Sequence, residues 1–277
     1  APKSNLLLTS SSATASTSMS HPFPFPFLCP IHKRPMSVFA RADPKYPRIS
    51  QQLDGLLGRL NRARDDEEEK REVEALILPL LTSQIVNSVY GADGSPTLGI
   101  LARDSFSLLT VALRLKPDPD IISMSLHLAI RDPETPTSSV KALVDAGADV
   151  NFNPLIAFTD EERPKAFSGG WQDASPLSCM FGSLSFEKDD PAVLEKMGIL
   201  LQAGAIADYK GSGKGSNTPL YWSIFIQDLK AVELLLSHNA DPNQLDCDGI
   251  TPLVAFAAQA AYSNKKRGAK TVLIHRA

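Results

Sequence analysis

Residues 218–243 decide the fold of this chain, and they read TPLYWSIFIQDLKAVELLLSHNADPN. The hydroxyl of Thr218 can accept a hydrogen bond from an unpaired N–H group at a helix start. Pro219 then suits the first helical position, where its missing N–H costs nothing. The aliphatic pair that begins at Leu235 is expected to pack against neighbouring helices. Asn239 follows where the chain must leave the helix in the left-handed conformation, for which asparagine is the best residue after glycine.

The same signals recur along the second half of the chain. The three capping tripeptides are Ser175-Pro176-Leu177, Thr218-Pro219-Leu220 and Thr251-Pro252-Leu253. In each of them we expect the leucine to face the core. The last two prolines are 33 residues apart. Gly147 and Gly204 occupy the position that Asn239 has in its own stretch, so we expect the left-handed conformation at all three. Recurring motifs with a spacing of this length predict a repeat architecture.

These stretches resemble the ankyrin repeat, whose signatures are Thr-Pro-Leu-His and Gly-Ala-Asp. The resemblance covers about half the chain, from Met124 onward, and several signatures occur together. The first clear unit keeps Leu126-His127-Leu128-Ala129 but has Met124-Ser125 in place of Thr-Pro. The later units depart from the histidine of the family with Ser178, Tyr221 and Val254. Insertions at residues 152–170 and 186–190 also lengthen the loops, which puts the subfamily in doubt but not the fold.

The resemblance implies an all-α fold, with an ankyrin-type helical solenoid over residues 124–277. This domain would hold about four repeats, the last of them incomplete. Residues 96–123 fit a degenerate repeat that caps the array, because a solenoid must present a polar face at its end. Residues 271–277 enter the second helix of a repeat when Leu273 is aligned on Leu235. Either the array is trimmed there, or that helix is its cap.

Residues 48–95 are predicted to form a separate helical region. Leu53, Leu56, Leu57 and Leu60 recur with the spacing of one apolar helix face. A second helix should begin at the acidic run of residues 65–69, because negative charge suits the positive end of a helix dipole. Pro79 should kink or split that helix.

Residues 1–47 have the composition of an unfolded leader. Residues 10–20 are almost entirely Ser, Thr and Ala, and residues 21–26 read HPFPFP, which favours extended chain. No acidic residue precedes Asp43. An acid-poor, hydroxyl-rich segment also fits a transit peptide for import into an organelle. The small number of arginines favours the disordered leader, and import remains the alternative.

The overall composition excludes several classes of protein. The chain has 277 residues, 43% of them hydrophobic, and a formal net charge of −3. Its 28 basic residues are scattered, whereas a nucleic-acid surface needs them concentrated on one face, so we expect no nucleic-acid partner. No apolar run is long enough to cross a membrane. Three distant cysteines indicate reduced thiols, hence a cytoplasmic or nuclear protein, and we expect a monomer.

No motif in the sequence points to catalysis, a cofactor or a metal. Residues 211–216 read GSGKGS, but a phosphate loop needs Ser or Thr directly after the lysine. Cys29 and His32 form one half of a possible zinc site, whereas structural zinc needs four ligands. His127 could act as a general base, but the resemblance implies a structural role in which it ties one loop to the next. We therefore expect no catalytic residue, no cofactor and no metal.

The resemblance implies a protein–protein interaction module, either an adaptor or a regulatory scaffold. Its partner would bind the concave surface that the loops and the first helix of each repeat form. In the register of the family, the projecting residues are Gln172, Asn217, Phe225, Ile226, Asp248, Ile250 and Gln259. Arg131 and Asp132 take the equivalent places in the first clear repeat. Trp171 and Lys214 lie one position earlier in their loops and should also project.

Phe225 and Ile226 are the strongest candidates for partner binding, because they are apolar at positions that are usually exposed. Apolar and aromatic anchors of this kind form binding hot spots. The alternative is that both side chains pack inward beside Trp222. Trp171, with Phe158 and Phe167 nearby, is the second candidate. The alternative there is that the insertion folds over the core and shields it.

The competing class of function is an enzyme or an enzyme-associated subunit. In that case the repeats would be an accessory domain, and the chemistry would lie in residues 48–120 or outside this chain. A ligand that protects the helical region against heat would favour this class.

Overall fold

The computed structural model describes residues 49–90, 94–158, 165–167, 174–182, 189–211, 217–246 and 249–257. Within these residues the fold is all-α, as predicted. It includes one antiparallel pair of short strands, β1 (Val89–Tyr90) and β2 (Ser95–Pro96). No helix in this part of the chain is long and apolar enough to cross a membrane. The predicted leader at residues 1–47 and the predicted helix at 271–277 lie outside the described residues.

The N-terminal region forms a helical hairpin of α1 (Gln51–Arg62) and α2 (Glu67–Ile77), which pack against each other. Leu53, Leu57 and Leu60 are buried along one face of α1, so the predicted apolar stripe is confirmed. Asp66 caps α2, and the acidic run fills its first turn. The predicted break at Pro79 is also confirmed, because α2 ends at Ile77 and continues as a short 3-10 turn, η1 (Leu78–Leu80).

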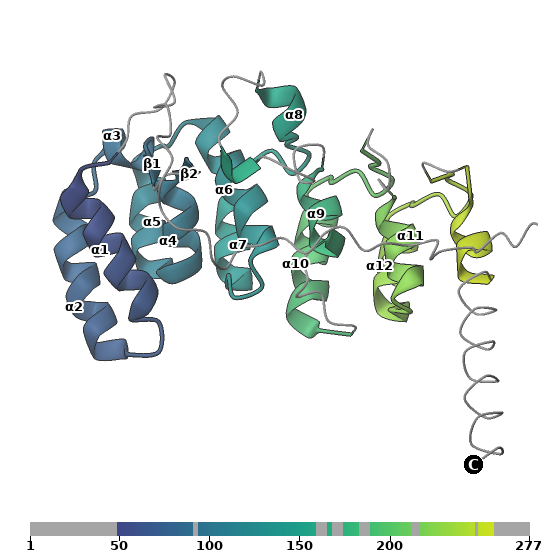
Figure 1. Ribbon diagram of the computed structural model, residues 1–277, viewed down its shortest axis with the longest axis horizontal. Coiled ribbons are helices and arrows are strands. Elements are labelled where there is room, and N and C mark those ends of the chain that lie inside the picture. Colours follow the sequence, from purple (N-terminus) through teal and green to yellow (C-terminus); the bar gives the residue numbers. More distant parts are fainter. Residues whose placement is uncertain are drawn as a thin grey trace, which may run out of the picture. The chain divides into compact units, whose positions relative to one another are not determined.

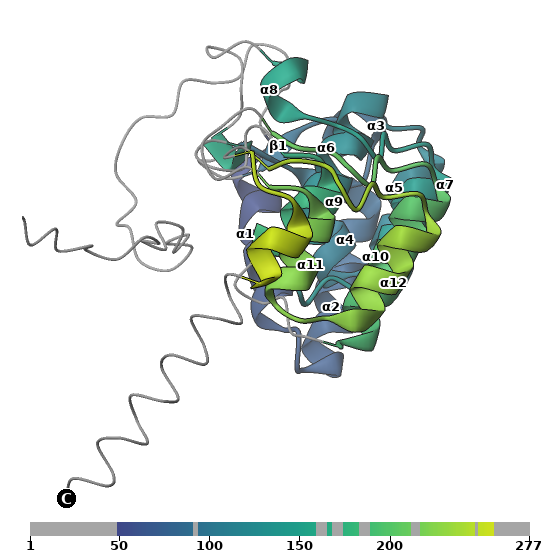
Figure 2. The same cartoon turned by 90° about the vertical axis from the view of Figure 1, so that its right-hand side faces the viewer.

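After the short helix α3 (Ser83–Val86), the chain forms successive helix pairs. These are α4 (Thr97–Asp104) with α5 (Phe106–Arg114), α6 (Pro119–Arg131) with α7 (Thr137–Asp145), α9 (Pro176–Gly182) with α10 (Pro191–Gln202), and α11 (Pro219–Phe225) with α12 (Leu229–Ser237). The first helices contact one another in the order α4, α6, α9, α11, and the second helices in the order α5, α7, α10, α12 (Figure 1). Figure 2 shows α11 and α12 side by side.

Two further elements belong to the insertion after α7, and one helix follows the last pair. The insertion contributes α8 (Pro154–Ala157) and the 3-10 turn η2 (Lys165–Phe167). Residues 252–257 are helical and begin directly after Thr251. The pair α4 and α5 lies within residues 96–123, with Leu108, Leu109 and Ala112 buried on α5.

The predicted helix starts are confirmed at all three tripeptides. The hydroxyl of Ser175 accepts a hydrogen bond from the N–H of Ser178 at 3.3 Å. Thr218 accepts from the N–H of Tyr221 at 3.2 Å, and Thr251 from the N–H of Val254 at 3.4 Å. In each case the proline takes the first helical position, so the cap and the proline act together as the start signal.

The predicted left-handed turns are confirmed at the ends of three second helices. Their φ angles are 93° at Gly147, 92° at Gly204 and 64° at Asn239. The N–H of the following residue then bonds back to a carbonyl in the last helical turn. These bonds run from Ala148 to Leu143 at 3.1 Å, from Ala205 to Leu200 at 2.9 Å and from Ala240 to Leu235 at 3.1 Å. The shared pattern is the Schellman motif, which satisfies carbonyls that the helix leaves unpaired.

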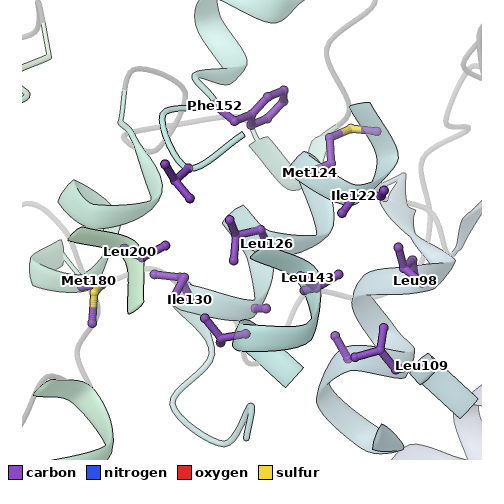
Figure 3. Close-up of a cluster of buried hydrophobic side chains, with 14 of the residues drawn as sticks. Leu98, Leu109, Ile122, Met124, Leu126, Ile130, Leu143, Phe152, Met180 and Leu200 are labelled. Carbon is purple, nitrogen blue, oxygen red and sulfur yellow. The ribbon is translucent and has the colours of Figure 1, made fainter. Parts of the chain in front are cut away.

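The hydrophobic core runs between the pairs, where side chains from consecutive helices meet (Figure 3). Leu98 and Leu109 come from α4 and α5, and Leu126 and Leu143 come from α6 and α7. Leu200 continues the core in α10. Burying one such side chain stabilises the fold by roughly 1.5–3 kcal/mol, so packing between pairs supplies most of the driving force.

Helix α6 begins earlier than the ankyrin register suggests. Its N-cap is Asp118, whose side chain accepts a hydrogen bond from the N–H of Asp120 at 2.9 Å. Pro119 follows as the first helical residue, so the cap-then-proline signal is present in the form Asp118-Pro119. Met124 therefore lies inside the helix, with none of its surface exposed.

The prediction that each tripeptide leucine faces the core is wrong for Leu253. Leu177 and Leu220 are 0% and 1% exposed, whereas Leu253 is 72% exposed. The helix of Leu177 is followed by a second helix and by another pair, and the helix of Leu220 is followed by a second helix and by the helix of residues 252–257. Within the described residues, no later helix packs against Leu253.

Asp104 holds the N-terminal hairpin to the helix pairs. Its carboxylate is fully buried and accepts hydrogen bonds from Arg64 Nε at 2.7 Å and from Arg103 Nε at 2.8 Å. Arg103 Nη2 donates to its second oxygen at 2.8 Å. Arg64 also pairs with Glu134 in the loop after α6. One buried carboxylate thus joins the α1–α2 turn, the end of α4 and the α6–α7 loop.

Replacing this carboxylate should cost considerable stability. We expect Asp104→Ala to lower the free energy of unfolding by about 3 kcal/mol, because two guanidinium groups lose their shared buried partner. Asp145→Ala is the control, since Asp145 pairs with Lys141 on the surface, where such a pair contributes at most about 1 kcal/mol. Urea denaturation of both variants measures the difference, and equal losses would contradict the role of Asp104.

Two glycines of the α10 unit should respond in opposite directions to alanine. Gly204→Ala should lower the free energy of unfolding by about 1 kcal/mol, because φ is 92° there and a Cβ atom disfavours that backbone. Gly198→Ala should raise it by roughly 0.5–1 kcal/mol, because Gly198 lies inside α10 and a Cβ atom would meet nothing within 4 Å. Thermal denaturation of the two variants checks the sign of each effect, and a shift of the same sign in both would overturn the assignment.

Candidate binding surface

An aromatic cluster on α11 forms the centre of the candidate surface, and it consists of Tyr221, Trp222 and Phe225. The rings of Tyr221 and Phe225 are nearly parallel, with an interplanar angle of 9° and centroids 6.3 Å apart. The ring of Trp222 stands edge-on to both, at 5.6 Å from Tyr221 and 5.7 Å from Phe225. These geometries are those that aromatic pairs prefer, so the rings hold one another in fixed positions.

The members of the cluster differ in burial. Tyr221 is 8% exposed, and Trp222 packs against the hydrophobic core with part of its surface accessible. Phe225 and Ile226 are half-buried. Ile226 is the C-cap of α11, and its N–H donates to the carbonyl of Trp222 at 3.0 Å. Phe225 thus lies beside Trp222, as the alternative interpretation has it, and yet keeps accessible surface for a partner.

Asn217 and Ile250 occupy equivalent places, one residue before a helix cap. Asn217 is half-buried directly before Thr218. Ile250 is 37% exposed and is held by a tight loop, in which its N–H donates to the Asp246 carboxylate at 2.8 Å and its carbonyl accepts from the N–H of Asp246 at 2.9 Å. The loop therefore fixes the backbone of Ile250 while leaving its apolar side chain in contact with solvent.

Arg131 and Asp132 have intramolecular partners. Arg131 Nη1 donates to the carbonyl of Ala166 at 2.9 Å, across the insertion. Asp132 faces Arg103 at 3.8 Å and accepts a hydrogen bond from the N–H of Glu134 at 3.0 Å. Both residues end α6, which α9 separates from α11. The structure does not bring them together with the aromatic cluster.

Five of the predicted contact residues lie outside the described part of the chain. They are Trp171, Gln172, Lys214, Asp248 and Gln259.

The insertion after α7 buries its aromatic residues. Phe152, Phe158 and Phe167 are 5%, 7% and 0% exposed. Phe152 meets Phe158 and Phe167 edge to face, with centroids 6.1 Å apart in both pairs. The ring of His127 on α6 stands 5.3 Å from Phe167 in the same kind of contact. These side chains therefore shield the core, as the alternative interpretation of the insertion requires.

His127 ties one loop to the next, which confirms the role that the ankyrin resemblance implies. It is fully buried on α6, and its Nε2 donates to the carbonyl of Ala174, the residue before the cap of α9, at 2.8 Å. Burial lowers the pKa of His127 to about 3, against the opposing effect of the bond to Ala174. The imidazole is therefore neutral at physiological pH.

Cys179 lies next to His127, but the two do not form a reactive pair. Its Sγ is 3.3 Å from His127 Nε2. Burial raises the pKa of the Cys179 thiol to about 12. A nucleophilic cysteine needs a lowered thiol pKa and a basic or cationic partner. Here burial raises the thiol pKa of Cys179 and lowers the imidazole pKa of His127.

Polar side chains in the loops lock neighbouring pairs in register. Asn151 accepts a hydrogen bond from the N–H of Ile206 at 2.8 Å and donates to the carbonyl of Gly204 at 3.1 Å. Asp208 is equivalent to Asn151 and accepts from the N–H of Asp241 at 2.9 Å. Sequence reasoning did not assign these residues a role. The available signal was their recurrence, since Asn151, Asp208 and Asn243 follow each left-handed turn at the same distance.

A second surface feature, an open groove between α2 and α5, was not predicted from the sequence. Its volume is about 270 Å³, and its lining includes the apolar residues Leu78, Leu108 and Val111. Glu74 also lines the groove and accepts hydrogen bonds from the hydroxyls of Ser105 at 2.6 Å and Ser107 at 2.9 Å. The residues that line the groove include no histidine and no cysteine.

Metal ligands do not gather anywhere in the described ranges. Within them, no three side chains of His, Cys, Asp or Glu come together in a way that could hold a metal ion.

Comparison with known families identifies one unit of the chain. The family model of the ankyrin repeat matches residues 216–247, which contain the Thr218 cap, α11, α12 and the left-handed turn at Asn239. The resemblance that the sequence motifs predicted is thereby confirmed. A search of curated proteins gives no match. Ankyrin repeats are, in general, protein–protein interaction modules.

The neutral state of His127 should make stability depend on pH. The unfolded chain binds a proton at His127 below about pH 6.5, whereas the folded chain does so only near pH 3. The contribution of neutral His127 to the free energy of unfolding is therefore fully present above pH 6.5. It is lost as the pH falls from 6.5 towards 3, by up to about 1.4 kcal/mol per pH unit. We expect a flatter decline in a His127→Gln variant, measured by urea denaturation between pH 7 and pH 5. If the free energy of unfolding fell equally with pH in the native chain and in the His127→Gln variant, His127 would not titrate in this way.

Proposed function

We propose that this ankyrin-repeat chain is a non-catalytic adaptor or regulatory scaffold. It binds a protein partner through the concave surface of a helical solenoid. The observation that carries the proposal is the aromatic cluster of Tyr221, Trp222 and Phe225 on the first helix of the unit that matches the ankyrin repeat. Accessible aromatic side chains with fixed orientations bind with little loss of conformational entropy, which favours them as anchors.

The solenoid is supported by the order of helix contacts. Each first helix contacts the first helix of the next pair, and each second helix contacts the next second helix. The hydrogen bonds of Asn151 and Asp208 join equivalent loops in successive pairs. Pairs joined in this way would form a continuous array, and arrays of helix pairs generate extended concave binding surfaces.

The binding surface is centred on α11 and on the loops that precede first helices. Phe225 and Ile226 supply apolar contact area at the end of α11, and Ile250 supplies it in the next loop. A partner with apolar side chains would remove this area from water, which is the main source of affinity in a hot spot. Arg131 and Asp132, with their intramolecular partners, contribute less to this surface.

The absence of catalysis is part of the proposal. Support comes from the Cys179–His127 pair, in which burial shifts both groups away from the charged states that a nucleophilic mechanism needs. The competing hypothesis is an enzyme or enzyme-associated subunit with its chemistry in residues 48–120 or outside this chain. Within residues 48–120 its candidate site is the groove between α2 and α5, where Glu74 is held by two serine hydroxyls. A small ligand that raises the melting temperature through this groove would favour that hypothesis.

Shortening the cluster should weaken partner binding without unfolding the chain. Affinity capture from cell extract with the full chain, beside a Phe225→Ala/Ile226→Ala variant, should recover a discrete protein with the first and lose it with the second. With that partner in hand, we expect Phe225→Ala to weaken binding by about 2 kcal/mol or more, roughly 30-fold in Kd.

Leu76→Ala is the matched control, because Leu76 is an exposed apolar residue on α2, 49% accessible and outside the candidate surface. It should leave binding unchanged. Thermal denaturation of all variants shows whether they remain folded. Equal recovery of the partner by the native chain and the Phe225→Ala/Ile226→Ala variant, with both folded, would remove α11 from the binding site.

A further inference from the structure

The groove between α2 and α5 is a mainly apolar surface that no described element covers. Its lining on α2 and the adjoining 3-10 turn η1 has the spacing of one helix face, and it consists of Arg71, Glu74, Ala75 and Leu78. Leu78 is 47% exposed, and Val111 lines the groove from α5. Because α5 is the second helix of its pair, the groove is separate from the candidate surface on the first helix α11 (Figure 1).

Negative charge is concentrated beside this apolar surface. Residues 65–78 contain seven acidic and two basic residues, whereas the whole chain has a formal net charge of only −3. Glu67 and Glu68 lie four and three residues before Arg71, hence on the same face of α2, and both are exposed. In the described part of the chain, no side chain forms an ion pair with either carboxylate. The groove therefore has uncompensated negative charge at the N-terminal end of α2.

Glu74 adds a carboxylate in a fixed position within the groove. Its Oε1 accepts a hydrogen bond from the hydroxyl of Ser105 at 2.6 Å, and its Oε2 accepts one from the hydroxyl of Ser107 at 2.9 Å. Because both donors are neutral hydroxyls, these bonds orient the carboxylate without compensating its charge. A cationic side chain of a ligand would compensate it, directly beside the apolar lining.

The walls of the groove favour a helical ligand. Both walls are helices, whose backbone groups bond within themselves, so an extended chain would find no backbone partners there. A helix satisfies its own backbone groups, and its apolar stripe packs between two other helices as ridges pack into grooves. A small molecule fits less well, because the volume of about 270 Å³ lies below the roughly 300–1,000 Å³ of ligand pockets and the groove is open.

We propose that this groove binds a basic amphipathic helix of a partner protein. The apolar stripe of that helix packs against Ala75, Leu78 and Val111. Its Lys or Arg side chains pair with Glu67 and Glu68. From Glu67 to Leu78 the helix rises about 16 Å, so the basic residues lie up to about three turns from the apolar anchor. This surface is additional to the one on α11, and the proposal does not depend on the proposed function.

Peptide selection on the full chain tests the proposal. Random peptides of about 16 residues, displayed on phage, are first depleted on a Leu78→Asp variant and then selected on the native chain. The peptides that remain depend on the apolar wall of the groove. We expect them to share apolar residues at the helical spacing i, i+3 or i+4, and i+7, together with Lys or Arg and a net positive charge.

Fluorescence anisotropy with the selected peptides, made synthetically, then measures each contribution. Leu78→Asp should weaken binding about tenfold or more, because it places a charge against the apolar stripe of the peptide. Glu67→Lys should weaken it about fivefold by reversing a charge. The matched controls are Leu76→Asp and Glu72→Lys, which make the same changes at exposed positions of α2 outside the lining. Both should leave the Kd within about twofold of the native value. Thermal denaturation checks that every variant remains folded.

Several results would overturn the proposal. The first group comprises the absence of an enriched peptide family, enriched peptides without a basic residue, and equal affinities of the native chain and the Glu67→Lys variant. A dimer in sedimentation experiments that Leu78→Asp dissociates would assign the groove to a second copy of the chain. Protection of residues 1–47 from hydrogen exchange that Leu78→Asp removes would assign it to the chain itself. A loss of peptide affinity in the Phe225→Ala/Ile226→Ala variant as large as that in Leu78→Asp would place the peptides on α11 instead.

Discussion

Burial of each helix pair against the next is the constraint on which the rest of this structure depends. A pair such as α11 and α12 has apolar residues on more sides than it can cover by itself. Leu220 is 1% exposed where later helices follow, and Leu253 is 72% exposed where none follows in the described residues. Because the free energy of burial is shared between neighbours, no pair is stable without another, which is the physical basis of repeat proteins.

Hydrogen bonds in the loops convert this packing into a fixed register. Asn151 and Asp208 each bind the backbone of the next unit, and His127 binds the carbonyl of Ala174 before the following helix. The bonds of Asn151 and Asp208 lie at exposed positions, whereas His127 is buried, so breaking its bond leaves a buried N–H group without a partner. The first helices and their preceding loops are held in place as a result. Side chains such as Phe225 are then presented on a rigid support, which suits recognition of a protein.

The sequence predicted the ends of the elements well and the environment of single side chains less well. The caps at Ser175, Thr218 and Thr251 and the left-handed turns were all found where the motifs placed them. The start of α6 was not, because its cap is an aspartate, Asp118, outside the ankyrin tripeptide. Of the predicted contact residues, Phe225 keeps accessible surface, whereas Arg131 donates to the carbonyl of Ala166 in an insertion that the family pattern lacks.

The sequence by itself determined the helix starts at the three Ser/Thr-Pro-Leu tripeptides and the left-handed turns at Gly147, Gly204 and Asn239. These features depend on local chemistry, in which a hydroxyl or carboxylate caps a helix, proline starts it and glycine or asparagine ends it. Only the tertiary structure decided which side chains remain accessible. The pairing of Asp104 with Arg64 spans 40 residues, and the bond from Arg131 to the carbonyl of Ala166 spans 35. Such contacts depend on how distant segments meet in space, and the pattern of neighbouring residues carries no signal for them.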